Sequence, residues 1–440
     1  MSMSNTVILH TTEDFARGEF DNVSAQHSRV TLDMVQGTRV PYGCYTSPAL
    51  PLPAFDALRM SWNAATPEGT AVEPQVRLLV DGNWTAWISF GRWGTRMQRT
   101  GASPAQRGPL VIWPDHLVLD SKVAGQAQLR IYLYTKDEHT TPAVTLLGVS
   151  VRAVDVIPAG GRPLHRQLHL LPYVMARRAP ALREVMDLAI GIVSLTNRWG
   201  ADLLPEEVAQ AMRDYRRPDD RDRRNLSFAA AAAGAWGFPA WACWTDLAGL
   251  RQELRQGCGA VVALESTPAQ QASGWPALRY AALRGFGTAE DGSSTALLCD
   301  PWAGETDFEA ETVMPLDEFL VAWNNQALCM RRRPGLPPEE RPRRQNIWLR
   351  KKDRQQPDLY CPHVGGEAVP LPEDFIEKGG VLAWSEPDEH PHATTGHRLL
   401  HFVQPVQGCI RLPTSEEHDR KCTVYAIDPT GSMLVGDVTV

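Results

Sequence analysis

Long apolar runs are missing from this sequence of 440 residues, and nowhere do about 18 consecutive apolar residues occur, the length that a membrane-spanning helix needs. The N-terminus, MSMSNTVILHTTEDF, also lacks the basic segment and long apolar segment of a secretory signal peptide. We therefore expect no membrane insertion and no signal peptide, and a cytoplasmic location by default.

Recognisable cysteine motifs are missing as well. The chain has 8 cysteines, but they form no CxxC pair and show no zinc-ligand spacing. In a chain of this length nothing demands a disulfide framework, so the sequence predicts reduced and mostly buried thiols.

Charge of one sign is not concentrated in any long segment. The formal net charge is −7, and Lys and Arg are scattered, which argues against nucleic acid or anionic lipid as a partner. The basic stretch YRRPDDRDRR (residues 215–224) is interrupted by aspartates, so we interpret it as a solvated loop.

Strand patterns dominate the first third of the chain. In AVEPQVRLLVDGNWTAWISFG, apolar residues alternate at Val76, Leu78 and Val80, and Asp81-Gly82 supplies a hairpin turn. Similar alternation recurs in AQLRIYLYTKD and AVTLLGVSVRAV. Many short strands at this spacing predict an N-terminal antiparallel β-sandwich over residues 1–157.

The periodicity changes after the Pro- and Gly-rich segment VIPAGGRPLH. Helical stretches (PALREVMDLAIGIV, LPEEVAQAMRDY, TDLAGLRQELRQG) come first, and strand-like runs follow, which predicts an α+β domain over residues 158–335. A second break, RRRPGLPPEERPRRQ, precedes residues 340–440, which we predict to be a β-rich C-terminal domain. The predicted fold class is therefore α+β multidomain.

Several stretches carry a family resemblance. SWNAATPEGTAVEPQVRLLVDGNWTAWISFGRWG (residues 61–94) is followed in order by GIVSLTNRWG, LRYAALRGFG, LLCDPWAG and LDEFLVAWNN. From residue 15 to about residue 330 the chain resembles the bacterial C39-like cysteine peptidases. The resemblance implies a β-sandwich followed by a papain-like domain.

A peptidase of this kind needs a thiolate at a helix N-terminus, a His base, an Asp or Asn that orients the His, and a Gln in the oxyanion hole. The corresponding positions hold Asp187, Arg279, Asp300 and, in a loose alignment, Met175, so only Asp300 keeps its residue type. Because a guanidinium stays charged and cannot act as a base, the resemblance predicts a peptidase fold with a degenerate triad.

The helix that carries Asp187 has its own expected geometry. Pro180 is a favourable first helical residue and good helix formers continue through Asp187, so we expect the helix to begin about two turns before it. Asp187 would then lie in mid-helix. We also expect Arg279 to lie within salt-bridging reach of Asp187 or Asp300.

Other reactive or ligating residues have simpler interpretations. Ser194 lacks a GxSxG motif and is interpreted as a helix-packing residue, and Cys243 and Cys258 as core or turn thiols. His390 and His392 are weak metal candidates, because no carboxylate or Cys accompanies them at a recognisable spacing. We expect no metal and no cofactor.

Three functions remain open at this point. The first is a catalytically inactive C39-like homologue that acts as a binding or structural module for an unknown peptide, protein or glycan. On this hypothesis the protein is not an enzyme. The second is an active cysteine-peptidase-like or metal-dependent hydrolase with a relocated site. The third is a carbohydrate-binding protein that uses Trp84, Trp87 and Trp93 of the sandwich; strand alternation favours core packing instead, because it places Trp84 and Trp87 on opposite faces.

Overall fold

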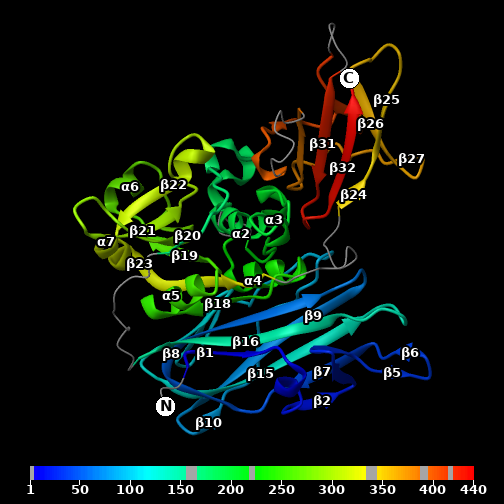
Figure 1. Cartoon of the computed structure of the whole chain (residues 1–440). Coiled ribbons are helices and arrows are strands. Elements are labelled where there is room, and N and C mark those ends of the chain that lie inside the picture. The colour runs from blue at the N-terminus through cyan, green and yellow to red at the C-terminus, as the bar shows by residue number, and fades with distance from the viewer. Residues whose placement is uncertain (1–3, 155–165, 218–222, 333–343, 387–394, 415–419) are drawn as a thin grey trace.

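The computed structural model describes residues 4–154, 166–217, 223–332, 344–386, 395–414 and 420–440. Three parts follow one another along the chain: a strand-rich first part, a second part of helices and strands, and a C-terminal part of strands (Figure 1).

The first part contains a 14-stranded sheet with the order β10-β9-β15-β8-β14-β13-β12 and further strands joined through β7, β9 and β16, together with a separate two-stranded sheet of β5 and β6. Its elements are β1 (Thr6–Leu9), α1 (Thr12–Phe15), β2 (Glu19–Asp21), β3 (Val23–Gln26), β4 (Arg29–Leu32), β5 (Met34–Val35), β6 (Thr38–Arg39), β7 (Tyr42–Thr46), β8 (Leu50–Ala65), β9 (Thr70–Val80), β10 (Asn83–Trp84), β11 (Ile88–Ser89), β12 (Ala105–Arg107), β13 (Leu110–Ile112), β14 (Leu117–Leu119), β15 (Ala124–Thr135) and β16 (Ala143–Ala153).

The predicted hairpin at Asp81-Gly82 is present. The two residues have φ angles of 50° and 76°, and Asn83 pairs with Val80 across the turn. Positive φ at both central positions is the requirement of a type I′ turn, which Asp-Gly meets at low cost. The long antiparallel pairing of β9 with β15 follows from the alternation seen in the sequence.

Strand β8 joins the sandwich to the second part. From Ala57 to Ala64 every residue of β8 is buried, so both faces of this stretch are covered. Antiparallel pairing with β16 covers its edge, and helix α4 (Leu226–Ala235) and strand β18 (Ala240–Trp244) lie against it. The hydrophobic core consequently continues from the sandwich into the second part without a break.

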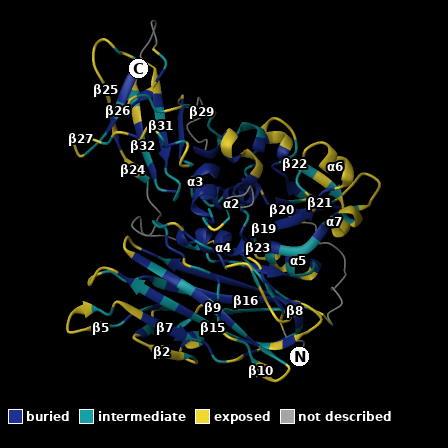
Figure 2. Cartoon of the chain, turned by 180° about the vertical axis from the view of Figure 1, so that it is seen from behind, coloured by how far each residue is buried: buried dark blue, intermediate teal, exposed yellow. Residues whose placement is uncertain are grey.

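The second part has the sheet order β18-β23-β19-β20-β21-β22, with β17 added to β20. Besides α4 and β18, its elements are β17 (Arg166–Gln167), η1 (Met175–Arg177), η2 (Pro180–Val185), α2 (Asp187–Asn197), α3 (Pro205–Ala211), α5 (Leu247–Arg255), β19 (Ala260–Glu265), α6 (Pro268–Ala272), β20 (Leu278–Thr288), β21 (Ser294–Cys299), η3 (Asp307–Ala310), β22 (Glu311–Pro315), α7 (Leu316–Ala322) and β23 (Trp323–Met330). Every residue of α2 is buried, so this helix is covered on all sides and not on one face only (Figure 2).

The C-terminal part has its own small core and two sheets, ordered β24-β32-β31-β28-β29 and β25-β26-β27, with β30 paired to β26. Its elements are β24 (Arg344–Asn346), β25 (Trp348–Lys351), β26 (Leu359–Val364), β27 (Glu367–Ala368), β28 (Val381–Ser385), η5 (Thr395–His397), β29 (His401–Phe402), β30 (Ile410–Arg411), β31 (Lys421–Ile427) and β32 (Met433–Thr439).

The expectation that all thiols are reduced is wrong at one place. Cys361 and Cys409 form a disulfide, because the pairing of β26 with β30 brings together two cysteines that are 48 positions apart. The other cysteines (Cys44, Cys243, Cys258, Cys299, Cys329 and Cys422) are free and buried, as predicted. No helix in the described ranges is long and apolar enough to cross a membrane.

Candidate functional site

Helix α2 begins at Asp187, and the expectation that this residue lies in mid-helix is wrong. The preceding segment, Pro180–Val185, is helical but forms a 3-10 helix, and Met186 is the N-cap of α2. The first bond of the α-helix runs from the N–H of Ile190 to the carbonyl of Met186. Asp187 therefore occupies the first turn, where a negative charge is stabilised by the helix dipole.

The carboxylate of Asp187 is fully buried and surrounded by donors. Oδ1 accepts from the N–H of Leu188 at 2.9 Å and from Nε of Arg224 at 3.1 Å. Oδ2 accepts from the N–H of Tyr280 and from Nε1 of Trp302, both at 3.1 Å, and from Nη2 of Arg224. The helix N-terminus is thus filled by a side chain of the chain itself and closed to another anion.

Arg279 and Asp300 form a second buried ion pair beside Asp187. Nε of Arg279 lies 2.9 Å from Oδ2 of Asp300, and the two side chains are 1% and 4% exposed. Nη1 of Arg279 also donates to the carbonyl of Glu265 and to Oγ of Ser266, both at 3.2 Å, and the guanidinium lies 5.0 Å from the ring centroid of Trp275. Burial raises the pKa of Asp300, and the charge of Arg279 offsets part of that rise.

The predicted positions are therefore neighbours in space. The Trp302 side chain donates to Asp187, and its backbone N–H donates to Oδ1 of Asp300 at 3.1 Å. The N–H of Met175 donates to the carbonyl of Pro301 at 2.8 Å, so it is already used. Asp187 pairs with Arg224 and not with Arg279. Neither a guanidinium nor these hydrogen-bonded carboxylates supplies a nucleophile with an adjacent base.

Arg224 is the main residue of this site that the sequence did not reveal. The interpretation of residues 215–224 as a solvated loop holds for Arg216, which is exposed, but is wrong for two others: Arg224 binds Asp187, and Arg223 is 7% exposed and donates to Oε1 of Gln210. The sequence signal for Arg224 was only indirect. A buried acid such as Asp187 needs a cation as its partner, but nothing in the sequence says which cation it is.

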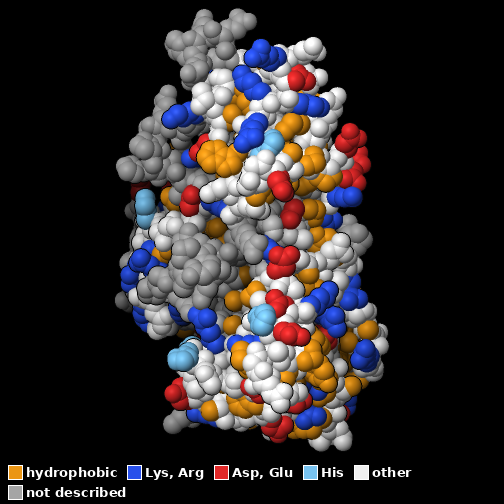
Figure 3. All heavy atoms as spheres, turned by 90° about the vertical axis from the view of Figure 1, so that its right-hand side faces the viewer, with side chains coloured by type: hydrophobic (Ala, Val, Ile, Leu, Met, Phe, Trp, Pro, Cys, Tyr) orange, Lys and Arg blue, Asp and Glu red, His pale blue; other side chains and the backbone are white. Residues whose placement is uncertain are grey.

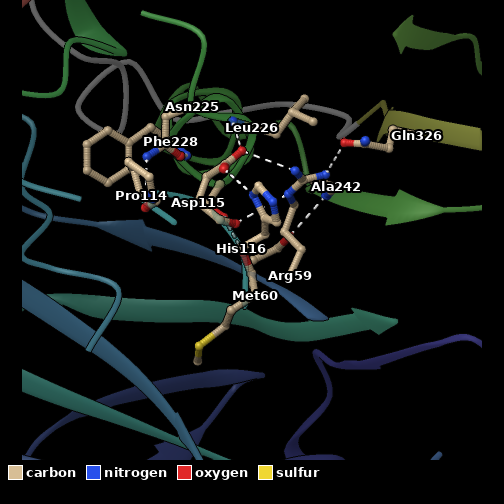
Figure 4. A network of polar contacts seen from close by, with 12 residues as sticks. Arg59, Met60, Pro114, Asp115, His116, Asn225, Leu226, Phe228, Ala242 and Gln326 are labelled. Atoms are coloured by element: carbon tan, nitrogen blue, oxygen red, sulfur yellow. Dashed lines mark hydrogen bonds and ion pairs between the residues drawn. The ribbon is translucent and has the colours of Figure 1, made fainter. Parts of the chain in front are cut away.

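A further polar network joins the sandwich to the second part (Figure 4). Arg59 of β8, 3% exposed, donates to Oε1 of Gln326 at 2.7 Å and pairs with Oδ2 of Asp115 at 3.2 Å. Asp115 also lies 2.7 Å from Nδ1 of His116 and accepts from the N–H of Leu226, in the first turn of α4. Burial acts to raise the pKa of Asp115, but Arg59 and His116 outweigh it and hold that pKa below its usual range.

Two polar residues of β8 take part in the same junction. Oδ1 and Nδ2 of Asn63 bond to the N–H and the carbonyl of Ala240, each at 2.9 Å, and Oγ of Ser61 accepts from the N–H of Ala242 at 3.0 Å. Ser61 and Asn63 therefore satisfy backbone groups of β18 that would otherwise be buried without partners. The sandwich face around β8 is a permanent internal surface.

The outer face of the β9–β15 pair is different. Trp84 and Trp87 both stack on Arg77, which lies 4.8 Å from each ring centroid, and Arg130 lies 4.1 Å from Trp87 and 5.0 Å from Tyr132. The prediction that Trp84 and Trp87 face opposite ways is wrong, because β10 ends at Trp84 and the strand alternation stops there. Both rings are half-buried, whereas Trp93 is 1% exposed and packs in the core.

The remaining candidates show no reactive arrangement. His390 and His392 lie outside the described residues, and within the described ranges no group of three or more His, Cys, Asp or Glu could hold a metal ion. Ser194 is fully buried inside α2. Cys243 lies in β18, and Cys258 lies two residues before the start of β19; both are buried free thiols, as expected.

Residues 5–151 match the family model described as the peptidase C39 N-terminal domain. The match covers the sandwich and supports a relationship to C39-related proteins. A search of curated proteins finds no match.

Three solved structures illustrate the similarity at the level of coordinates. The first is the infectious bursal disease virus Gt strain, with 9% identity and a TM-score of 0.19 over 32% of this chain and 34% of that chain. The second is TmCBM61 in complex with β-1,4-galactotriose, with 10% identity and a TM-score of 0.18 over 34% of this chain and 91% of that chain. The third is the Podospora anserina GH26-CBM35 β-(1,4)-mannanase, with 12% identity and a TM-score of 0.18 over 43% of this chain and 34% of that chain. The chain thus spans about a third of the length of the first of them. At such TM-scores the similarity carries no argument about fold or function.

Proposed function

We propose that the protein is a non-catalytic, C39-related binding protein, in which a papain-like second domain keeps the positions of a peptidase triad but fills them with ion pairs. The observation that carries the proposal is the position of Asp187. Its buried carboxylate occupies the helix N-terminus and accepts hydrogen bonds from donors on four segments of the chain. A thiolate and an imidazole are both replaced by residues that cannot perform their chemistry.

The thiols of the chain support this proposal. The free cysteines are buried, and burial raises the pKa of the Cys299 thiol to about 12 and also raises the pKa of Cys44. A thiol with a raised pKa is a poor nucleophile at neutral pH. An active hydrolase with a relocated site finds no comparable support among the described residues.

Peptide hydrolysis and thiol labelling test the proposal together. We expect the purified chain to leave a fluorogenic peptide library intact and iodoacetamide to label its cysteines slowly and without a preferred site. Papain, assayed in parallel, is the positive control. Hydrolysis that disappears in both Asp187→Asn and Arg279→Gln, or one cysteine labelled rapidly and stoichiometrically, would refute the proposal.

A second candidate function is carbohydrate binding by the outer face of the sandwich, and the stack of Trp84, Arg77, Trp87 and Arg130 favours it. Flat rings held in place by guanidinium groups suit the apolar faces of sugar rings. Nε of Arg77 is held by Oε1 of Gln128 at 2.8 Å, and Nε of Arg130 by Oε1 of Gln75 at 3.1 Å, so the face is ordered before binding.

Affinity electrophoresis in gels that contain xylan, galactan, mannan or pectin tests this second function. We expect retardation by at least one polysaccharide, and its loss in Trp87→Ala. The matched control is Trp348→Ala, because Trp348 lies in the C-terminal part and is 70% exposed. Unretarded migration in all four gels, or equal loss of retardation in both variants, would exclude the outer face as a glycan site.

A further inference from the structure

A cavity of about 210 Å³ adjoins the outer face of the sandwich, and Trp87 belongs to both. The other walls come from β11 and the loop after it, from β12 and β13, and from Arg216 of the second part. The volume is below the range of sites for drug-sized ligands. The cavity therefore suits one unit of a longer ligand that continues across the outer face.

The cavity wall carries two cations and no acid. Arg107 and Arg216 line it, whereas no Asp or Glu of the described residues does. Both side chains are exposed, so a ligand can reach them. Nε of Arg216 donates to the carbonyl of Gly101 at 3.0 Å, and within the described ranges the guanidinium of Arg107 makes no hydrogen bond, ion pair or ring contact. Asp214, whose charge acts on Arg216, is buried and does not line the cavity.

Two more guanidinium groups approach the Trp87 ring, from Arg77 of β9 and Arg130 of β15. Both side chains are half-buried and are held by glutamine side chains, and neither forms an ion pair with a carboxylate in the part of the chain that the structure describes. Glu73 of β9 pairs instead with Arg92, at 3.5 Å. Four guanidinium groups near one aromatic ring consequently have no carboxylate at ion-pairing distance among the described residues.

The side of the molecule drawn in Figure 3 shows a more ordinary surface, on which basic and acidic side chains are interspersed among the described residues. One exposed arginine without a partner would not distinguish the region around Trp87. The distinguishing feature is that four accessible cations share one ring and one cavity. Such a local excess of positive charge attracts anionic groups.

We infer that the ligand of the outer sandwich face is an acidic polysaccharide. A sugar ring packs on Trp87, and carboxylate or sulfate groups of the chain pair with the arginines of the face and the cavity. The inference rests on carbohydrate binding by this face, the second function proposed above, and names the class of sugar. Because the net charge of the protein is −7, a polyanion gains nothing from the molecule as a whole and depends on this local group of cations.

Isothermal titration of the full chain tests the inference with two matched pairs of ligands. The first pair is trigalacturonate and its methyl ester, and the second is a sulfated galactan trisaccharide and its desulfated form. We expect at least one acidic oligomer to bind at least about tenfold more tightly than its neutral form, the effect of one charge-assisted hydrogen bond. The pair that shows the preference identifies the charged group. Triglutamate, an acid without a sugar ring, should bind more weakly than that acidic oligomer.

The outcomes separate this inference from the function on which it rests. Equal binding of the acidic and neutral forms in both pairs would overturn the acidic assignment and leave carbohydrate binding intact. Absence of binding by all four oligomers would contradict both. Binding of triglutamate as tight as that of the acidic oligomers would overturn the inference in another way, because charge alone would then be recognised.

Two variants locate the binding. Arg107→Gln should weaken the acidic oligomer about threefold, as expected for one exposed ion pair, and leave the neutral form unchanged. Ser103→Trp fills the cavity from an exposed loop position and should abolish the preference for the acidic form. The matched control is Arg350→Gln, at an exposed arginine of β25 in the C-terminal part. Native preference in both cavity variants, or equal weakening in the control, would refute the location.

Discussion

At the scale of single residues, the two buried ion pairs differ in what surrounds them. Asp187 receives hydrogen bonds from backbone and side-chain donors on both oxygens. Asp300 depends more heavily on one partner, Arg279, and its raised pKa reflects that weaker compensation. The Arg279–Asp300 pair is therefore the more informative pair to break.

Replacement of Arg279 by Ala should lower the free energy of unfolding by about 3 kcal/mol, because it leaves a buried acid without its cation. Urea denaturation of the native chain and the variant measures the difference. The matched control is Arg152→Ala, which breaks the pair with Asp56, whose side chains are 51% and 32% exposed. That loss should be under about 1 kcal/mol. Equal losses in the two variants would contradict the assignment of a buried, strongly coupled pair.

At the scale of elements, the alternating strands and the Asp81-Gly82 turn were predictable, because period and turn chemistry are local properties. The start of α2 was not. The helix formers after Pro180 suit a 3-10 turn as well as an α-helix, and packing decided between them. Arg224 and the Cys361–Cys409 disulfide were missed for another reason: each joins segments that only the tertiary fold brings together.

Asp115 gives the junction at α4 a predictable pH dependence. Its folded-state pKa lies below the ordinary value of 3.8, so its contribution to stability is complete above that value and is lost as the pH falls toward the folded-state pKa. We expect the free energy of unfolding of the native chain to fall between about pH 5 and pH 2, and that of Asp115→Asn to fall less. Urea titrations across this range measure both. An equal fall in the free energy of unfolding of the native chain and of Asp115→Asn over this pH range would contradict the role given to Asp115.

At the scale of the whole molecule, the distribution of cores matters most. The sandwich and the second part share one continuous core, and one face of the C-terminal part also joins it through Val381, Ala383, Leu400, Tyr425, Ile427 and Met433. A second, smaller cluster and the disulfide lie in the C-terminal part alone. Elements that share a core lose their packing together, while an element with its own core can melt alone. The chain should therefore unfold as two cooperative units and not three, the smaller unit being the cluster that lies in the C-terminal part alone.

Calorimetry checks the number of units. We expect two transitions, and reduction with dithiothreitol should lower only the one that belongs to the C-terminal part. The chain-entropy relation puts the loss at about 4 kcal/mol for a loop closed across 48 residues. Cys243→Ser, at a free buried thiol, serves as the control whose response to reductant is unchanged from the native chain. Three transitions, or an equal shift of both, would contradict the shared core.

The donors around Asp187 also constrain how this chain can change over generations. If a mutation placed a cysteine at position 187, the buried pair of Asp187 and Arg224 would be broken, at a cost of about 3 kcal/mol, a large part of the stability of an ordinary domain. Arg279 would still stand where a base is needed. A change to a nucleophile at this position by single steps would therefore pass through poorly folded intermediates, so selection would rarely replace the present occupant of the helix N-terminus.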